Sequence, residues 1–188
     1  MRVFIAVDIN EQVKAAIKQL QKRLMDATST GSKDIAWVRP DAMHLTLKFL
    51  GEINDNLLVE VCNTVKEVSE EHKGFDLDIE NVGSFGGKSA RVLWVGSGAG
   101  SDQITTIAQD IDQRLEKIGF SREARLFTAH LTLCRIKSFK AGVELTNLVE
   151  DYKGFKAGTV FIDSIRIYQS QLTPQGPVYT VLGSYKLT

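Results

Sequence analysis

Two segments of the chain, which begin at His44 and His130, carry the same four residues, His-Leu-Thr-Leu. Successive side chains of a β-strand point to opposite faces, so the histidine and the threonine of each segment share one face and the leucines share the other. Such a pair is about 7 Å apart within a strand, a spacing at which an imidazole and a hydroxyl suit the oxygens of one phosphate group. Thr46 and Thr132 are therefore predicted to bind phosphate beside the two histidines.

Two histidines that face one phosphate are suited to acid–base catalysis. One neutral imidazole takes a proton from water, while the other, protonated, gives a proton to the leaving oxygen. Histidine is the side chain whose ordinary pKa allows both steps near neutrality. A single histidine is more often a structural residue, but the same frame in two copies favours catalysis by His44 and His130. His72, at the end of a predicted helix, has the simpler role of a partner for the helix dipole.

A metal site is the alternative use of these histidines. Zinc needs three or four converging ligands, and Cys134 is the obvious additional ligand for His130. Four residues along a strand cover about 13 Å, so these two side chains cannot hold the same ion. We therefore predict that no metal takes part and that Cys134 is a packing or cleft-wall residue.

The elements that must position these residues follow from the spacing of apolar side chains. Compact apolar runs indicate strands, and apolar residues three and four apart indicate helices. Strands are predicted at residues 2–8, 35–39, 43–50, 75–83, 90–96, 127–136, 159–170 and 178–187. Helices are predicted at 11–29, 55–72, 101–118 and 143–152, with Asn10 and Ser101 beginning the first and third, and turns at 84–89 and 172–177.

An internal repeat organises these elements. The segments RVFIAV and RVLWVG begin at residues 2 and 91, which are 89 residues apart, and the two HLTL segments are 86 residues apart. We therefore predict one bilobal domain over residues 1–188, with a repeat of approximately 1–89 and 90–188. Its fold class is α+β, with two pseudo-symmetric lobes that enclose a central cleft. Each lobe is expected to hold an antiparallel or mixed sheet with helices on its outer face.

Charge is balanced over the whole chain but polarised along it. The 23 basic and 23 acidic residues give a net charge of zero, so no overall field attracts nucleic acid or an anionic membrane. Residues 121–140 nevertheless carry a net charge of +4, and residues 54–82 carry −6. A basic patch beside His130 is what a phosphodiester ligand needs. Arg135 belongs to this patch, but strict alternation places it on the leucine face, so it reaches phosphate only through a β-bulge or the strand end.

Composition limits the class of protein and its location. Apolar residues make up 43% of the chain and charged residues 24%, as in an ordinary folded protein. The longest apolar run near the N-terminus, residues 3–7, is shorter than a signal-peptide core or a membrane span. Cys62 and Cys134 cannot form a disulfide framework. We expect a soluble cytoplasmic protein with reduced thiols and no membrane contact.

Taken together, these segments resemble the 2H phosphoesterase superfamily, specifically its RNA 2′,3′-cyclic phosphodiesterase branch, also called 2′-5′ RNA ligase. The double His-x-Thr motif is typical of the superfamily, whereas WVRP before the first motif and LTPQGPVY near the C-terminus are typical of this branch. The resemblance covers nearly the whole chain. It implies a hydrolase without metal or cofactor that opens the terminal 2′,3′-cyclic phosphate of RNA and leaves a 2′-phosphomonoester.

The resemblance also implies roles for individual residues. His44 is implied as the acid that protonates the departing 3′-oxygen, and His130 as the base that activates water. Phe85 is implied to stack on the terminal base, a contact worth about 1–3 kcal/mol. The phosphate-binding residues that it implies are Thr46, Thr132 and Arg135.

The implied partners are RNAs that end in a 2′,3′-cyclic phosphate, tRNA fragments among them, and a monomer is expected for a two-lobed cleft. Two alternatives stay open at this point. The same site could ligate, with an RNA 5′-hydroxyl in place of water, and so form a 2′-5′ bond. A noncatalytic module that binds RNA ends is the other alternative, although binding alone does not require two titrating groups.

Overall fold

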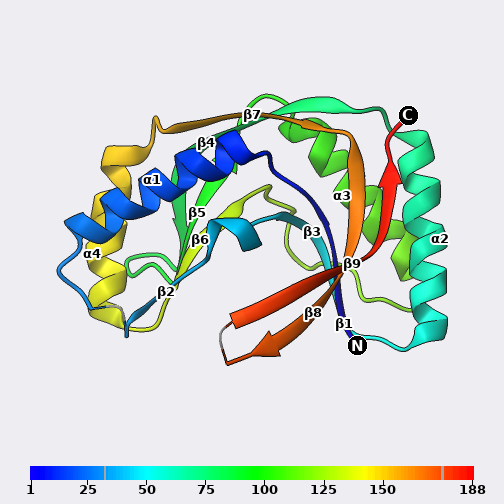
Figure 1. The fold of residues 1–188 in the computed structure, drawn as a ribbon, viewed down its shortest axis with the longest axis horizontal. Coiled ribbons are helices and arrows are strands. Elements are labelled where there is room, and N and C mark those ends of the chain that lie inside the picture. Colours follow the sequence, from blue (N-terminus) through cyan, green and yellow to red (C-terminus); the bar gives the residue numbers. More distant parts are fainter. Residues whose placement is uncertain (32, 175) are drawn as a thin grey trace.

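Two antiparallel sheets form the centre of the molecule in a computed structural model that describes residues 1–31, 33–174 and 176–188 (Figure 1). Sheet A contains, in order, β3 (Leu45–Glu52), β1 (Arg2–Val7), β8 (Ser164–Thr173) and β9 (Gly176–Lys186). Sheet B contains β2 (Ile35–Trp37), β6 (Leu131–Ile136), β5 (Val92–Ser97), β4 (Phe75–Phe85) and β7 (Lys156–Ile162). The predicted α+β class is confirmed, and the sheets are antiparallel rather than mixed.

The helices lie on the outer sides of the sheets. Asn10 begins the first of them as predicted, because its side-chain oxygen accepts a hydrogen bond from the Val13 N–H at 2.9 Å. In the described part of the chain, no helix combines the length and the apolar character that crossing a bilayer requires. The helices are α1 (Glu11–Ala27), α2 (Asp55–Glu71), α3 (Ser101–Glu116) and α4 (Phe139–Val149), with 3-10 turns at Pro40–Ala42 and Glu150–Tyr152.

α3 begins at Ser101 as predicted but is capped by a different residue, and α4 begins earlier than predicted. The residue before α3 that caps it is Gly100, with a φ of 87°, and Ser101 is already helical. A side chain is disfavoured at this φ, and a Cβ there would also meet the Asp76 carbonyl oxygen at 2.3 Å. α4 begins four residues before the predicted start, because the Ser138 hydroxyl accepts a hydrogen bond from the Ala141 N–H at 3.2 Å.

The single strand predicted at residues 159–170 is wrong. The chain leaves sheet B after β7 and enters sheet A with β8, and Asp163 separates the two strands. A local apolar pattern is the same for one long strand and for two strands in line, so it does not reveal this change of sheet. The turn predicted at 172–177 includes residue 175, which lies outside the described residues.

Each lobe takes elements from both halves of the chain. The first-half helix α1 packs on β7 and α4 beside sheet B, whereas the second-half helix α3 packs on α2 and β3 beside sheet A (Figure 1). Strands are exchanged in the same way, because β4 pairs with β5 in sheet B and β8 pairs with β1 in sheet A. A lobe is therefore not one half of the chain.

The strand β1 is buried on both faces. Ile5 belongs to the main core under the helices. Phe4 and Ala6 point to the other face, where they form a smaller cluster with Tyr168. Burial on both sides explains why the sequence of this strand is a continuous apolar run. It also places the rings of Phe4 and Tyr168 next to the first His-x-Thr motif.

Candidate active site

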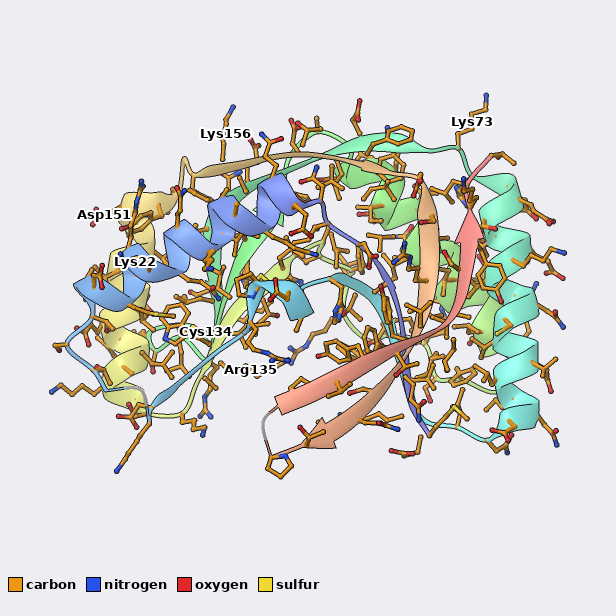
Figure 2. The ribbon with its side chains drawn as sticks, in the orientation of Figure 1. Lys22, Lys73, Cys134, Arg135, Asp151 and Lys156 are labelled. Carbon is orange, nitrogen blue, oxygen red and sulfur yellow. The ribbon has the colours of Figure 1, made fainter. Side chains whose placement is uncertain are left out.

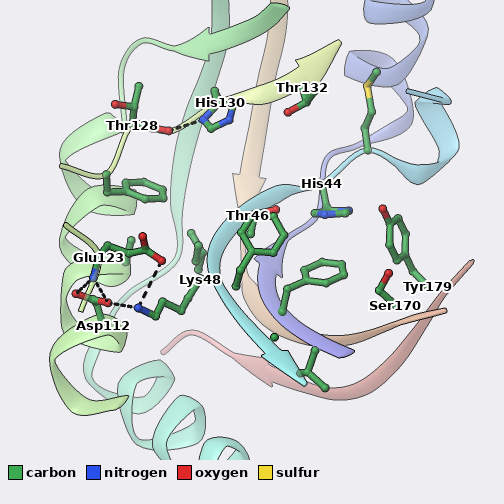
Figure 3. Close-up of a pocket in the computed structure, with 18 of the residues that line it drawn as sticks. His44, Thr46, Lys48, Asp112, Glu123, Thr128, His130, Thr132, Ser170 and Tyr179 are labelled. Atoms are coloured by element: carbon green, nitrogen blue, oxygen red, sulfur yellow. Dashed lines mark hydrogen bonds and ion pairs between the residues drawn. The ribbon is translucent and has the colours of Figure 1, made fainter. Parts of the chain in front are cut away.

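A cleft of about 1270 Å³ is lined by residues of both sheets. Figure 3 shows His44 and Thr46 on one side of this space, with His130 and Thr132 on the other. The two motifs thus come from facing sheets, and their leucines are buried as the alternation predicts. All the residues predicted for the site line the cleft: His44, Thr46, Phe85, His130, Thr132 and Arg135.

A β-bulge in β6 decides where Arg135 points. Thr132 pairs with Trp94 and Cys134 pairs with Leu93, so one residue between them has no partner of its own. Both residues that follow Thr132 are buried, and alternation resumes one position later. Arg135 is therefore exposed and lines the cleft, on the side from which strict alternation would exclude it (Figure 2).

The same bulge occurs in β3. Thr46 pairs with Ala6 and Lys48 pairs with Ile5, which again leaves one residue between them unpaired. Lys48 thus occupies the position that Cys134 has in β6. Both are buried, and burial raises the pKa of the Cys134 thiol to about 12, which keeps it protonated.

His130 is held by a backbone hydrogen bond. Its Nδ1 lies 2.7 Å from the carbonyl oxygen of Thr128, as the dashed line in Figure 3 marks. A carbonyl only accepts, so Nδ1 carries the proton and Nε2 of the neutral ring is the free acceptor. This tautomer is the one that a general base needs.

His44 sits in an aromatic environment. Its ring stacks on Phe4 with centroids 4.4 Å apart and meets the Tyr179 ring edge-on at 5.0 Å. Burial lowers the pKa of His44 to about 4, although the negative charge of Asp8 and a backbone hydrogen bond with Ala42 act in the opposite direction. The free protein therefore holds His44 neutral at neutral pH.

The low pKa of His44 makes stability depend on pH. The unfolded chain binds this proton near pH 6.5 and the folded protein only near pH 4. Between these values the unfolded state holds more protons, so lowering the pH should reduce the free energy of unfolding, by about 3 kcal/mol over the whole window. Urea unfolding at pH 7 and pH 4.5 should show a smaller loss for His44→Gln than for the wild type. Equal losses would contradict a buried neutral imidazole.

Phe85 lies beside His130 at the far end of β4. The two rings meet edge to face with centroids 5.1 Å apart, and Phe85 also contacts Trp94 at 5.3 Å. Its side chain is 39% exposed, which leaves part of the ring open to a ligand. Trp94 lies against Gly83, where a Cβ would meet the indole ring at 2.2 Å, so glycine is required beneath it.

Lys48 is a site residue that the sequence reasoning missed. Its side chain is 3% exposed, and its Nζ lies 2.5 Å from Asp112 Oδ1 (Figure 3). The same Nζ lies 2.7 Å from the Ser121 carbonyl oxygen. Burial alone would raise the pKa of Asp112, but hydrogen bonds from Lys48 and the Glu123 N–H outweigh it and hold this pKa below its usual value. The contact ties β3 to α3 and to the loop that leads to His130. A lysine inside an otherwise apolar strand was the available signal.

His72 and the other side chains of metal-binding types are described by their contacts. His72 follows α2, and its Nε2 lies 3.1 Å from Asp110; both residues line the same cleft as the two motifs but belong to neither. Within residues 1–31, 33–174 and 176–188, no group of three or more His, Cys, Asp or Glu side chains is placed to hold a metal ion. The polar side chains of the two motifs are the imidazoles of His44 and His130 and the hydroxyls of Thr46 and Thr132.

Comparison with known proteins places the chain in a family. Residues 7–94 and 95–179 each match the model of LigT-like phosphoesterases. The chain is 33% identical to the RNA 2′,3′-cyclic phosphodiesterase of Archaeoglobus fulgidus, over 95% of this chain and 96% of that protein. It is 34% identical to the protein of the same name from Thermotoga maritima, over 97% and 93% of the two chains.

A solved structure agrees with the fold. E. coli LigT complexed with 3′-AMP matches with a TM-score of 0.80 at 22% identity, over 100% of this chain and 98% of that one. At this identity the match concerns the arrangement of the chain alone. Because the family model covers both halves, and the relatives align over nearly the full length, the chain belongs to the LigT-like phosphoesterase family, as its resemblance to the 2H phosphoesterases predicted.

Proposed function

We propose that this protein hydrolyses the terminal 2′,3′-cyclic phosphate of RNA to a 2′-phosphomonoester by metal-independent catalysis with two histidines. The observation that carries the proposal is that His44 and His130, each two residues before a threonine, line one cleft from opposite sheets (Figure 3). The names of the relatives from A. fulgidus and T. maritima support the reaction class. tRNA fragments are among the proposed substrates, and a cytoplasmic monomer is the proposed form.

His130 is the proposed base. The proton on its Nδ1 is held by Thr128, so its Nε2 removes a proton from water. The water oxygen attacks phosphorus, and the bond from phosphorus to the ribose 3′-oxygen breaks on the opposite side. His44, from the facing sheet, gives its proton to that departing oxygen. In-line attack needs the two groups on opposite sides of phosphorus, which histidines from two sheets satisfy.

His44 must acquire its proton together with the substrate, since its pKa in the free protein is about 4. A phosphodiester anion beside an imidazole favours the charged form and raises this pKa. The Phe4 ring stacked at 4.4 Å also favours a cationic ring, because an aromatic face attracts positive charge. Substrate binding thus protonates His44 so that it can act as the acid, whereas in the free protein the buried His44 ring carries no charge.

The two threonines are proposed to donate hydrogen bonds to the phosphate. Thr46→Ala and Thr132→Ala should each lower kcat/KM about 10- to 150-fold, since a hydrogen bond to a charged group is worth about 1.5–3 kcal/mol. The two losses should be similar, because each threonine follows its histidine in the same bulged frame. Steady-state kinetics checks this, with Thr180→Ala, an exposed threonine of β9, as the matched control. A loss at one threonine alone would contradict equal roles.

The product identifies the orientation of the substrate. If the terminal base stacks on Phe85, the ribose is fixed beside His130 and its 3′-oxygen faces His44. The test is to incubate the protein, in EDTA, with an oligonucleotide that ends in a 2′,3′-cyclic phosphate and to locate the monoester by NMR. A 2′-phosphate formed at an undiminished rate is expected. A dominant 3′-phosphate would reverse the assigned roles, inhibition by EDTA would contradict metal independence, and a joined product with a 5′-hydroxyl RNA would indicate ligation.

A further inference from the structure

The cleft extends beyond the histidine pair, on the side away from Phe85. In sheet B, β2 lies on one side of β6, whereas β5 and β4 lie on the other. Phe85 at the end of β4 and Arg39, two residues after β2, are therefore on opposite sides of the strand that follows His130, and both line the cleft. A volume of about 1270 Å³ also exceeds the range of about 300–1,000 Å³ usual for a small-molecule pocket. There is room for more than one nucleotide.

Three arginines gather at this end of the cleft. Arg2 comes from β1, Arg39 from the segment after β2, and Arg135 from β6, and all three line the cleft. Burial raises the pKa of the Tyr179 hydroxyl, and the positive charges of these three arginines oppose that rise. Tyr179 lines the cleft together with all three, and it pairs with Ser170 of β8 in sheet A. Its ring also contacts His44 at 5.0 Å, so this cluster adjoins the catalytic pair (Figure 3).

No arginine of this cluster forms an ion pair in the described part of the chain; Glu52, which lies opposite Arg2 in β3, pairs with the Met1 amine at 3.3 Å. Arg114, Arg122 and Arg166 form ion pairs with carboxylates elsewhere in the molecule. Among the described residues, Arg2 and Arg39 have no such partner, and both are exposed. Grouped guanidinium charges repel each other unless an anion lies between them. If Arg135 binds the cyclic phosphate, that single phosphate does not account for Arg2 and Arg39.

We propose that Arg2 and Arg39, together with Tyr179, form a second anion subsite for the phosphodiester that joins the terminal nucleotide of the RNA to the preceding one. The proposal rests on the proposed function and deepens it. The planar guanidinium matches phosphate oxygens in pairs, and the Tyr179 ring offers a stacking surface for a base. The preferred substrate is then an oligonucleotide, and a nucleoside cyclic phosphate, which lacks this phosphodiester, is a poor one.

The test compares kcat/KM for three substrates with the same terminal 2′,3′-cyclic phosphate. The first is a mononucleoside, the second a dinucleotide with a natural phosphodiester, and the third the same dinucleotide with a neutral methylphosphonate linkage. The wild type should favour the phosphodiester over the methylphosphonate by about 10-fold or more. Arg39→Ala and Arg2→Ala should each remove most of this preference. Arg23→Ala, which removes an exposed charge on α1 outside the cleft, should retain it.

Each other outcome overturns a defined part of the proposal. Variants that keep the wild-type preference exclude the two arginines from the subsite. Equal losses on all three substrates place them on the cyclic phosphate instead. A wild type that opens all three substrates at equal rates contradicts the subsite alone, whereas one that opens none contradicts the proposed function. Thermal unfolding of both variants identifies any loss that is due to misfolding, and Arg39→Lys, which keeps the charge, should retain part of the preference.

Discussion

Replacing His44 or His130 with alanine is expected to reduce turnover of a 2′,3′-cyclic phosphate about 10²- to 10⁴-fold, because each substitution removes one partner in proton transfer. Both residues line the cleft at the start of a strand whose leucines hold it in the core, so the fold should persist. Initial rates with an oligonucleotide substrate measure the effect, and circular dichroism verifies the fold. Near-native turnover of either variant would remove that histidine from the mechanism.

The pH dependence separates the two roles. The wild-type rate should be bell-shaped, because the base must be neutral and the acid protonated. Removal of His130 should abolish the fall toward acid pH, and removal of His44 the fall toward alkaline pH, each measured on the residual activity. His72→Ala is the matched control, since this histidine contacts Asp110 and lies outside both motifs. If both variants lost the same side of the bell-shaped pH–rate profile, the separate roles of base and acid would be contradicted.

Breaking the buried ion pair of Lys48 and Asp112 is expected to have the largest effect on stability. Asp112→Ala leaves a cation whose side chain is 3% exposed with only the Ser121 carbonyl and a more distant carboxylate of Glu123 at 3.5 Å. An uncompensated buried charge costs about 3–5 kcal/mol, and we expect a loss near the lower value because those two partners persist. Equilibrium unfolding in urea measures this change in free energy.

A double substitution that removes both charges and a substitution in an exposed ion pair serve as controls. Lys48→Met combined with Asp112→Leu removes both charges, so the double variant should be more stable than Asp112→Ala. Lys66→Ala breaks an exposed pair with Glu70, in which the side chains are 62% and 60% exposed, and should cost less than about 1 kcal/mol. A surface-like value for Asp112→Ala would show that water reaches the Lys48 ammonium.

The sequence was sufficient to predict how the residues of the two His-x-Thr motifs are oriented, because that orientation is local. The leucines that flank Thr46 and Thr132 must be buried, and alternation then turns the histidines and threonines toward the same side. Duplication of the motif added the information that two such frames exist. Whether the two motifs face one another depends on how the two sheets pack. The repeat suggested this arrangement, and the structure shows residues of both motifs lining one cleft.

What the sequence did not reveal depends on contacts between distant segments. The direction of Arg135 follows from a bulge, and the bulge is visible only in the pairing of β6 with β5. Lys48 was read as part of a strand, because its partners Asp112 and Ser121 lie 64 and 73 residues away. The change of sheet at Asp163 is likewise invisible in a pattern that continues as apolar on both sides of it.

The exchange of elements between the lobes determines how this chain must reach its native state. Tyr168, in the middle of β8, donates a hydrogen bond to Asp8, which directly follows β1, and these two residues are 160 residues apart in sequence. Closing such a loop has a large entropic cost, and chains dominated by distant pairings fold slowly. Neither half contains a complete sheet, so an isolated half would expose the apolar face of β1 or β5. The cleft should therefore assemble in one late cooperative step, and two separately expressed halves would recover activity only after mixing.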